Sequence, residues 1–433
     1  MERELAFCYG SRKIQIRIPE KNIGSFIEPK KLIGAVSLDV VMKRANIGRK
    51  LNGKKVAIMI EDCTRDEPHN EIIHAICSAL GACVHAQFII TTGTHESNNK
   101  GNRQIAKMII GACEEKRIGD FDVHIHDCEK DEFMHNGRTS RGTFVESNTV
   151  CKDCDVFLIG ADMKPHYFAG YSNAVKNFLP GICSFETVRQ NHALAMFPES
   201  CFGTHPFHPD EGRRKNPVAE DMVEAMGLIA SDRPKYALAL ISSREGNKYS
   251  ISWAKAGEIQ KITREGIREV DRRMCFLAKP SKYVIISPGN SPEDETVYVW
   301  QRCLELCSKC ISDGAEILVI AESGKKEEQG IGPARTLDVF YNILRRPIDE
   351  IIKMGEKLDE YLMYMHKPVK FALLRKRVKN IFLYSSLPDR IVEEIHMTPV
   401  SEPQEVVDHW LKNDQNAKIL CINAGNKVAL YPK

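Results

Sequence analysis

The sequence predicts an α/β protein of two domains, with mostly parallel sheets flanked by helices. Short apolar runs typical of buried strands alternate with segments whose apolar residues recur at helical spacing. Such alternation indicates β-α-β units and parallel pairing. The chain of 433 residues is long enough for two or three cores. We expect an N-terminal cofactor-binding and catalytic domain over 1–276, a C-terminal α/β domain over 277–415, and a terminal strand over 416–433 that could return to the N-terminal domain.

The elements expected in the N-terminal domain follow from apolar periodicity. After alternating runs such as 13–18 and a helical piece over 36–47, the segment 70–80 places Ile72, Ile76 and Leu80 on one helix face. The expected strands are 54–60, 86–91, 122–126, 156–161 and 236–242, and the expected helices are 70–80, 104–113, 218–229 and 256–273.

The second half of the chain repeats this pattern. Its apolar runs predict strands at 283–287, 316–321, 381–384 and 419–422. A helix is expected over 296–311, and several helices over 337–377. There is no low-complexity tract and no short internal repeat.

Composition excludes several classes of function. The net charge of +3 is too small to indicate binding to nucleic acid or to an anionic membrane surface. No apolar run approaches the roughly 20 residues of a membrane span, and the charged start does not resemble a secretory signal. Fifteen cysteines in a large chain without an export signal are expected to be free thiols, which predicts a cytoplasmic location.

Candidate chemistry gathers in the segment 163–192, which follows the strand expected at 156–161. It holds His166, Lys176 and His192 in a setting rich in glycine and proline. In open α/β sheets, ligands bind beyond the carboxyl ends of the strands. Taken singly, each histidine could be a loop or core residue and the lysine could face solvent, so residue types alone leave both interpretations open.

Two further motifs follow expected strands. Asp62 and Arg65 come after the strand 54–60, where a carboxylate could orient a guanidinium for a planar anion or form a structural ion pair. Thr92-Gly93-Thr94-His95 follows the strand 86–91 and could expose backbone N–H groups to a phosphate. The sequence lacks both G-x-G-x-x-G and the P-loop pattern, which argues against an ordinary dinucleotide fold or P-loop.

Other groups of metal-ligating residue types have ordinary explanations. His205, His208, Asp210 and Glu211 could form a metal cluster, but their spacing favours a loop. Cysteine pairs at 151/154 and 307/310 suggest zinc, yet positions 303, 307 and 310 share one helix face and favour small buried thiols.

The segment 163–192 resembles the signature of the lactate racemase family, the nickel-pincer nucleotide enzymes. That pattern is roughly P-H-x-x-A-G-[FY]-S-G-G-x-K, then P-G and N-H. The matching positions are Pro165-His166, Ala169-Gly170-Tyr171-Ser172, Lys176, Pro180-Gly181 and Asn191-His192. Asn173 and Ala174 depart from it, since the family has two glycines there.

The resemblance extends over most of the chain, from about residue 10 to the strand 316–321. Asp62-Cys63-Thr64-Arg65 is similar to the family's D-x-[ST]-R, His95 stands in its G-x-H, and Asn216-Pro217 resembles its Asn-Pro helix start. Tyr298 matches a family tyrosine, whereas Val299 replaces a glutamine and Arg302 a lysine.

The resemblance implies a fold, a cofactor and roles for residues. It implies an active site in the interdomain cleft and a 2-hydroxyacid racemase or epimerase that works by reversible hydride transfer to a nickel-pincer nucleotide, a pyridinium-3,5-bisthiocarboxylic acid mononucleotide. The implied roles are cofactor tether for Lys176, cofactor contacts for Asp62 and Thr94, nickel ligand for His192, acid/base catalysis for His95 and His166, and substrate binding for Arg65, Tyr298 and Arg302. A small 2-hydroxy acid and the enzymes that make the cofactor are the implied partners, with no nucleic acid and no membrane.

Two alternatives stay open at this point. A metal-dependent lyase or hydrolase could use His166, His192 and His205. A non-catalytic cofactor-binding protein would hold the cofactor without turning over any hydroxy acid.

Overall fold

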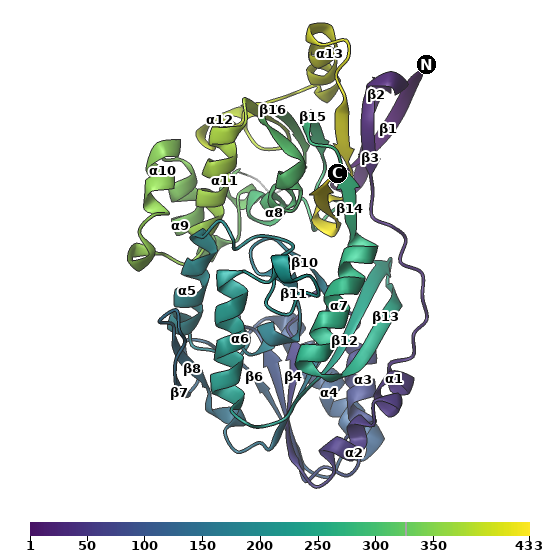
Figure 1. Ribbon diagram of the computed structural model, residues 1–433, viewed down its shortest axis with the longest axis vertical. Helices are drawn as coiled ribbons and strands as arrows, with labels where there is room; N and C mark the ends of the chain where they lie inside the picture. The colour runs from purple at the N-terminus through teal and green to yellow at the C-terminus, as the bar shows by residue number, and fades with distance from the viewer. Residues whose placement is uncertain (325–326) are drawn as a thin grey trace. The chain divides into compact units, whose positions relative to one another are not determined.

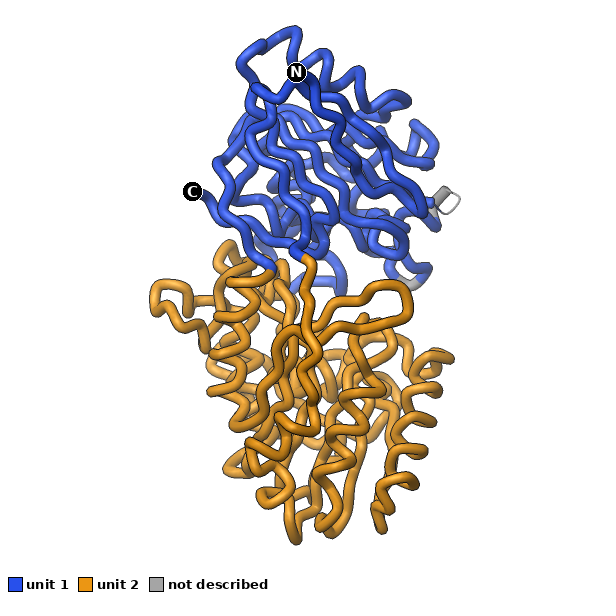
Figure 2. Tube along the Cα trace, turned by 90° about the vertical axis from the view of Figure 1, so that its right-hand side faces the viewer, with its two compact units in different colours: residues 1–30, 274–433 blue, residues 31–273 orange. Residues whose placement is uncertain are grey.

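The computed structural model describes residues 1–324 and 327–433. The chain forms two compact units (Figure 2): unit 1 comprises residues 1–30 and 274–433, and unit 2 comprises residues 31–273.

Unit 2 is built on a six-stranded sheet of strand order β13-β12-β9-β4-β5-β6 (Figure 1). All pairs are parallel except the edge pair β12–β13. The strands are β4 (Lys55–Glu61), β5 (His85–Thr91), β6 (Phe121–Ile125), β9 (Val156–Asp162), β12 (Lys235–Glu245) and β13 (Lys248–Glu258). The central strand β9 is buried along its whole length, as expected for a sheet covered on both faces.

Helices and two short hairpins complete unit 2. The helices are α1 (Leu38–Arg44), α2 (Ile47–Leu51), α3 (His69–Cys77), α4 (Lys100–Lys116), α5 (Phe185–Ala193), α6 (Pro217–Ala230) and α7 (Ile259–Met274). The hairpins are β7 (Phe133–Arg138) with β8 (Phe144–Asn148), and β10 (Lys164–His166) with β11 (Gly170–Ser172). One core joins the first four helices to the sheet, with Ile72 and Ile76 of α3 against Ile58 of β4.

Unit 1 has a second six-stranded sheet, of strand order β18-β17-β16-β15-β19-β3, in which all pairs are parallel. The strands are β3 (Ile23–Ile27), β15 (Ser281–Ile286), β16 (Ile311–Ile320), β17 (Asn380–Tyr384), β18 (Thr398–Pro399) and β19 (Ile419–Ile422). A separate pair joins β14 (Cys275–Ala278) to β20 (Ala429–Pro432). The helices are α8 (Val297–Cys307), α9 (Ala334–Leu344), α10 (Ile348–Met354), α11 (His366–Arg377), α12 (Asp389–Glu394) and α13 (Pro403–Asn413).

The first 30 residues belong to unit 1 because they complete its sheet and cover one face of it. The hairpin of β1 (Glu2–Tyr9) and β2 (Arg12–Pro19) places Phe7 and Ile16 in one core with Leu318 of β16 and Trp410 of α13. The strand β3 then pairs with β19. Such long-range pairing cannot be deduced from the local pattern of residues 1–30.

The predicted fold class, mixed α/β with mostly parallel sheets and flanking helices, is confirmed. The compact units differ from the predicted domains at the N-terminus, where residues 1–30 lie in unit 1, and at the C-terminus, where β20 pairs with β14 of the same unit. The prediction of helix over 256–273 was wrong at its start, because Lys248–Glu258 form the antiparallel strand β13 and the helix begins at Ile259.

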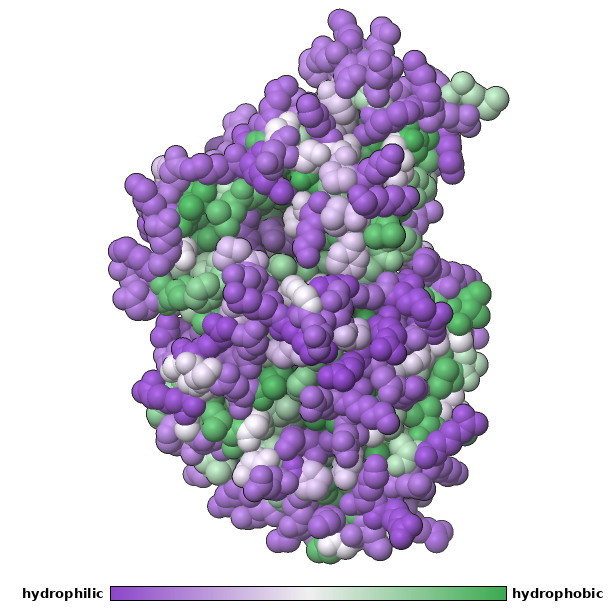
Figure 3. Space-filling view, viewed as in Figure 1, coloured by the Kyte–Doolittle hydropathy of each residue, from purple (hydrophilic) through white to green (hydrophobic). Residues whose placement is uncertain are grey.

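Two further observations concern the surface and the thiols. No helix in the described part of the chain is long and apolar enough to cross a membrane, and hydrophilic residues predominate on the face drawn in Figure 3. All fifteen cysteines carry free thiols, as predicted.

Candidate active site

Three neighbouring parallel strands of unit 2 bring the predicted motifs to one edge of the sheet. In the order β5-β4-β9, Glu61 pairs with Thr91 and Met59 pairs with Ile159, so the carboxyl ends of the three strands lie together. Asp62 follows β4, the turn Thr92–His95 follows β5, and β10 with His166 follows β9. This edge is where an open α/β sheet binds its ligands.

Asp62 and His95 form a hydrogen-bonded pair at this edge. The Nδ1 atom of His95 lies 2.5 Å from Oδ2 of Asp62, and the other carboxylate oxygen accepts bonds from the backbone and hydroxyl of Thr64 at 2.8 and 2.6 Å. Burial raises the pKa of the Asp62 carboxyl, but the charge and hydrogen bond of His95, with help from Arg65 and Thr64, outweigh it and hold the pKa below its ordinary value. A carboxylate here keeps the proton of neutral His95 on Nδ1 and leaves Nε2 as a base.

The turn that carries His95 is less suited to bind a phosphate than its composition suggested. The Gly93 N–H donates to the carbonyl of Gly181, and the His95 N–H donates to the carbonyl of Thr92. Two of its backbone donors are therefore already used. Thr94 lies half-buried in this turn, so its role as a cofactor contact stays a prediction.

His166 ends β10 and has a different environment. Its Nδ1 accepts the backbone N–H of Ala169 at 3.1 Å, so a neutral His166 carries its proton on Nε2. The tight return to β11 needs Gly170, whose φ is +78° and where a Cβ atom would lie 1.8 Å from the carbonyl oxygen of Thr204. The neutral forms of His95 and His166 thus present an acceptor and a donor, respectively.

Lys176 lies in a short 3-10 turn, Ala174–Asn177, directly after β11. Asn173 caps this turn, since its Oδ1 accepts the N–H of Val175 at 2.9 Å. The Lys176 side chain is buried, and burial together with the charge of Arg65 lowers its pKa to about 7, against a smaller opposing effect of Glu61. Near neutral pH, the Lys176 side chain is therefore a neutral, nucleophilic amine in a large fraction of the molecules.

His192 lies at the end of α5, where its ring meets Phe168 edge-on at 5.2 Å. Burial, followed by the charge of Lys176, lowers the pKa of His192 to about 3. The imidazole is therefore neutral at physiological pH, the form that binds metals.

Tyr298 and Arg302 lie on α8 of unit 1. The ring of Tyr298 contacts Phe340 and Tyr364, and Lys367 Nζ lies 4.1 Å from its centroid and donates to its carbonyl at 2.6 Å. Arg302 pairs with Glu293, and its Nε is buried without an acceptor among the described residues.

The other candidate metal clusters have structural roles. His205 Nδ1 accepts the N–H of Phe207 and His208 Nδ1 that of Asp210, as in a folded loop. The thiols of Cys303, Cys307 and Cys310 are fully buried, as predicted. In the described ranges, no group of three or more His, Cys, Asp or Glu side chains is arranged to hold a metal ion.

Sequence reasoning missed two residues beside the predicted ones. Phe168, which is 4% exposed, meets both His166 and His192 edge-on at 4.6 and 5.2 Å. Lys367 is buried beside Tyr298, and burial and then the charge of Arg302 lower its pKa to about 7. Phe168 could have been noticed between the two histidines, whereas no pattern in the sequence links Lys367 to Tyr298.

Comparison with known proteins shows what this chain is similar to. Residues 9–203 match the lactate racemase N-terminal domain. The chain is 25% identical over 435 residues to the lactate racemase of Thermoanaerobacterium thermosaccharolyticum, covering 95% of this chain and 96% of the relative. The chain is therefore similar to a lactate racemase over nearly its whole length.

Further comparisons agree in sequence or in fold. The lactate racemase of Lactiplantibacillus plantarum is 21% identical over 290 residues, 66% of this chain and 64% of that protein. The lactate racemase apoprotein of T. thermosaccharolyticum has the same fold, with a TM-score of 0.82 at 21% identity over 99% of this chain and 100% of that one. A protein from Thermotoga maritima matches with a TM-score of 0.66 at 14% identity over 94% and 100%.

The residues of unit 2 fit the cofactor that similarity to the lactate racemases implies. A tether needs a neutral amine, and a nickel ligand needs a neutral imidazole; burial provides both, at Lys176 and His192. One amide atom of buried Asn177, next to Lys176, has no hydrogen-bond partner among the described residues. Buried polar atoms without partners are rare and mark places where a ligand can complete the bonding.

His205 should make the protein sensitive to mild acid. Burial, followed by the charge of His208, lowers the pKa of His205 to about 3. Its stabilising effect is present above the unfolded pKa of about 6.5 and is lost as the pH falls toward 3. The free energy of unfolding should fall between pH 7 and pH 5, and this fall should be smaller by about 2 kcal/mol in His205→Gln than in wild type. Urea denaturation at the two pH values measures it.

The wild-type protein, measured over the same pH range, provides the comparison. An identical loss in His205→Gln and wild type would contradict the prediction.

Proposed function

We propose that this chain is a member of the lactate racemase family and an isomerase, a racemase or epimerase of 2-hydroxy acids. The observation that carries the proposal is the Asp62–His95 pair, at the same strand edge as His166, Lys176 and His192. Relatives over most of the chain are named lactate racemase. The proposed site includes Arg65, Tyr298 and Arg302 as substrate-binding residues.

The two histidines divide the proton transfer. His95 Nε2, supported by the Asp62 carboxylate, would take the hydroxyl proton of a 2-hydroxy acid. His166, whose neutral form carries its proton on Nε2, would return a proton to the oxygen. For the opposite enantiomer the two residues exchange roles, which general acid/base catalysis by imidazole near neutral pH allows.

The cofactor would be held by residues of unit 2. Lys176 would tether it as an amide-type bond, Asp62 and Thr94 would contact it, and His192 would bind the nickel. When bound, the nickel-pincer nucleotide would supply the hydride acceptor that lets the α-hydrogen leave without a carbanion beside an ionised carboxylate. Arg65 and Arg302 would bind that carboxylate through their guanidinium groups. The enzymes that make this cofactor are therefore required partners.

The proposed location is the cytoplasm, which is consistent with the fifteen free thiols.

Lys176 is predicted to be the attachment point of the cofactor. The Lys176→Ala protein, produced together with the cofactor-making enzymes, should show no mass adduct and no racemisation, because the only amine proposed as tether is gone. Intact-protein and peptide mass spectrometry measure the adduct. The exposed Lys100 at the start of α4 offers the control, since Lys100→Ala should keep both adduct and activity. An adduct on another lysine would contradict the assignment.

Nickel binding and proton transfer are predicted to separate by mutation. His192→Ala should lose nickel, because it removes the only protein ligand proposed. His95→Ala and His166→Ala should keep nickel and lose racemisation by ~10²- to 10⁴-fold, the usual contribution of a general acid or base. Elemental analysis and chiral chromatography measure the two effects, with His74→Ala on α3 as control. Equal loss of nickel in all three site variants would contradict this division of roles.

The substrate is predicted to be larger than lactate or to carry a second carboxylate. Val299 lacks the amide of the family glutamine, Arg302 replaces the family lysine, and Lys367 adds a buried amine beside Tyr298. A single apolar or charged difference gives a preference of about 1–3 kcal/mol rather than an absolute switch. A panel of 2-hydroxy acids, assayed for racemisation with the loaded enzyme, should therefore not rank lactate first in kcat/KM.

Two outcomes of that panel would change the interpretation. Lactate ranking first would refute the preference. Turnover of no member, with nickel and cofactor in place, would favour the non-catalytic cofactor-binding protein.

A further inference from the structure

A single buried amide holds together the two turns that carry Asp62 and His95. Asn102, in the first turn of α4, is 1% exposed. Its Oδ1 accepts the N–H of Cys63 at 3.0 Å, and its Nδ2 donates to the carbonyls of Glu96 and Ser97 at 3.1 and 3.4 Å. Cys63 follows Asp62 and Glu96 follows His95 in the chain, so Asn102 bridges the backbone of both turns one residue away from the pair.

Packing at the start of α4 fixes the position of Asn102 relative to the turn of Asp62. A Cβ atom on Gly101 would lie 2.5 Å from Cβ of Cys63, so the helix backbone meets the Asp62 turn closely enough that only glycine fits. The N-cap residue Asn99 accepts the N–H of Gly101 at 2.8 Å and fixes the first turn of the helix. The position of Asn102 relative to Cys63 is therefore set by packing as well as by its own hydrogen bonds.

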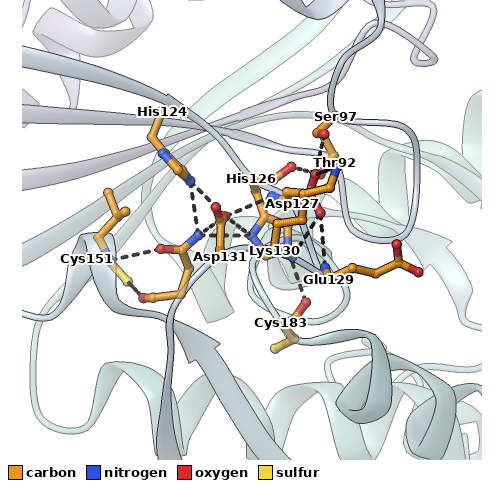
Figure 4. Close-up of polar contacts among 12 residues, drawn as sticks. Thr92, Ser97, His124, His126, Asp127, Glu129, Lys130, Asp131, Cys151 and Cys183 are labelled. Carbon is orange, nitrogen blue, oxygen red and sulfur yellow. Dashed lines mark hydrogen bonds and ion pairs between the residues drawn. The ribbon is translucent and has the colours of Figure 1, made fainter.

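The turn of His95 has a second anchor, the loop that follows β6 (Figure 4). Thr92 donates its hydroxyl to the carbonyl of His126 at 2.6 Å, and Ser97 donates to Oδ2 of Asp127 at 2.6 Å. Asp131 fixes this loop by accepting from the N–H of Asp127 at 2.8 Å and by contacting His124 Nε2 at 2.8 Å. The His95 turn is thus bound to the β6 loop on one side. On the other side, the Asn102 side chain ties it to the turn of Asp62, in addition to the contacts of the pair itself and of Thr64.

We propose that Asn102 is a positioning residue for the Asp62–His95 pair. The two side chains come from separate turns, and their contact of 2.5 Å is lost if the turns separate by even about 1 Å, because hydrogen bonds weaken steeply with distance. Without the bridge, His95 would no longer be held with its proton on Nδ1 and Nε2 aimed outward. Asn102 acts through His95 and does not touch the substrate. This inference rests on the proposed role of His95 as acid/base.

The expected effect is on the chemical step more than on binding. Asn102→Ala should lower kcat on the order of 10²-fold, the size expected when a catalytic group is misplaced by about 1 Å, with a KM within a few-fold of wild type. Asn102→Asp, which keeps an acceptor for the Cys63 N–H but cannot donate to the two carbonyls, should fall between wild type and Asn102→Ala. The cofactor adduct and the nickel content should stay at the wild-type level in both.

A matched control exists in unit 1. Asn22 is 2% exposed, and its Nδ2 donates to the carbonyls of Gln415 and Ala417 at 3.0 and 2.9 Å. Asn22→Ala loses the same kind of buried bridge and should lower the melting temperature about as much as Asn102→Ala, yet leave kcat unchanged. This comparison separates positioning from a general loss of stability.

A spectroscopic arm tests the inference without turnover. In the full-length chain labelled with ¹⁵N-histidine, wild type and Asn22→Ala should show a downfield Nδ1 proton from the His95–Asp62 hydrogen bond, and Asn102→Ala should lose it. Asp62→Asn identifies that signal. If Asn102→Ala does not fold, Asn102→Asp carries both measurements.

The outcomes are distinguishable. Retention of the downfield proton, or a kcat for both Asn102 variants equal to that of Asn22→Ala, would overturn the inference. If wild type itself turns over no hydroxy acid, the proposed function fails, and the proton signal alone then decides whether Asn102 positions the pair.

Discussion

The parallel pairing of β5, β4 and β9 is the constraint on which the candidate site depends. Parallel strands in register end at the same edge of the sheet. The residues that follow these strands therefore lie close together, although they are far apart in the sequence. Asp62, His95 and His166 each follow a different strand, and the segment of Lys176 continues from the last of them. A change in strand order would separate these residues even if every motif were kept.

Burial then sets the chemistry of the groups that the sheet brings together. Removing charge from water disfavours the protonated forms of lysine and histidine, and the resulting pKa values of about 7 for Lys176 and about 3 for His192 make both groups neutral ligands or nucleophiles. Asp62 is just as buried but keeps its charge, because His95, Arg65 and Thr64 stabilise the carboxylate. One environment therefore holds neutral bases and a fixed anion side by side.

The sequence allowed the strand ends and the candidate residues at them to be predicted, because apolar runs and turn residues are local signals. Pairings between distant segments could not be predicted in this way. Residues 1–30 complete the sheet of unit 1 through β3 and β19, and Asn102 binds Cys63 and Glu96 from a helix whose own pattern shows only amphipathicity. The pattern Asp62-x-x-Arg65 did not reveal that the Asp62 carboxylate accepts from Thr64 and contacts His95, while the charge of Arg65 helps to lower its pKa.

Asn173 fixes the turn that carries Lys176. Its Oδ1 accepts the N–H of Val175 at 2.9 Å and so caps the turn, and its Nδ2 donates to the carbonyl of Tyr171 at 3.0 Å and lies 3.3 Å from Nε2 of His205. Each of these contacts is buried, so the amide fixes the turn from within the protein. Residue 173 therefore bears on how the lysine is held rather than on whether one is present.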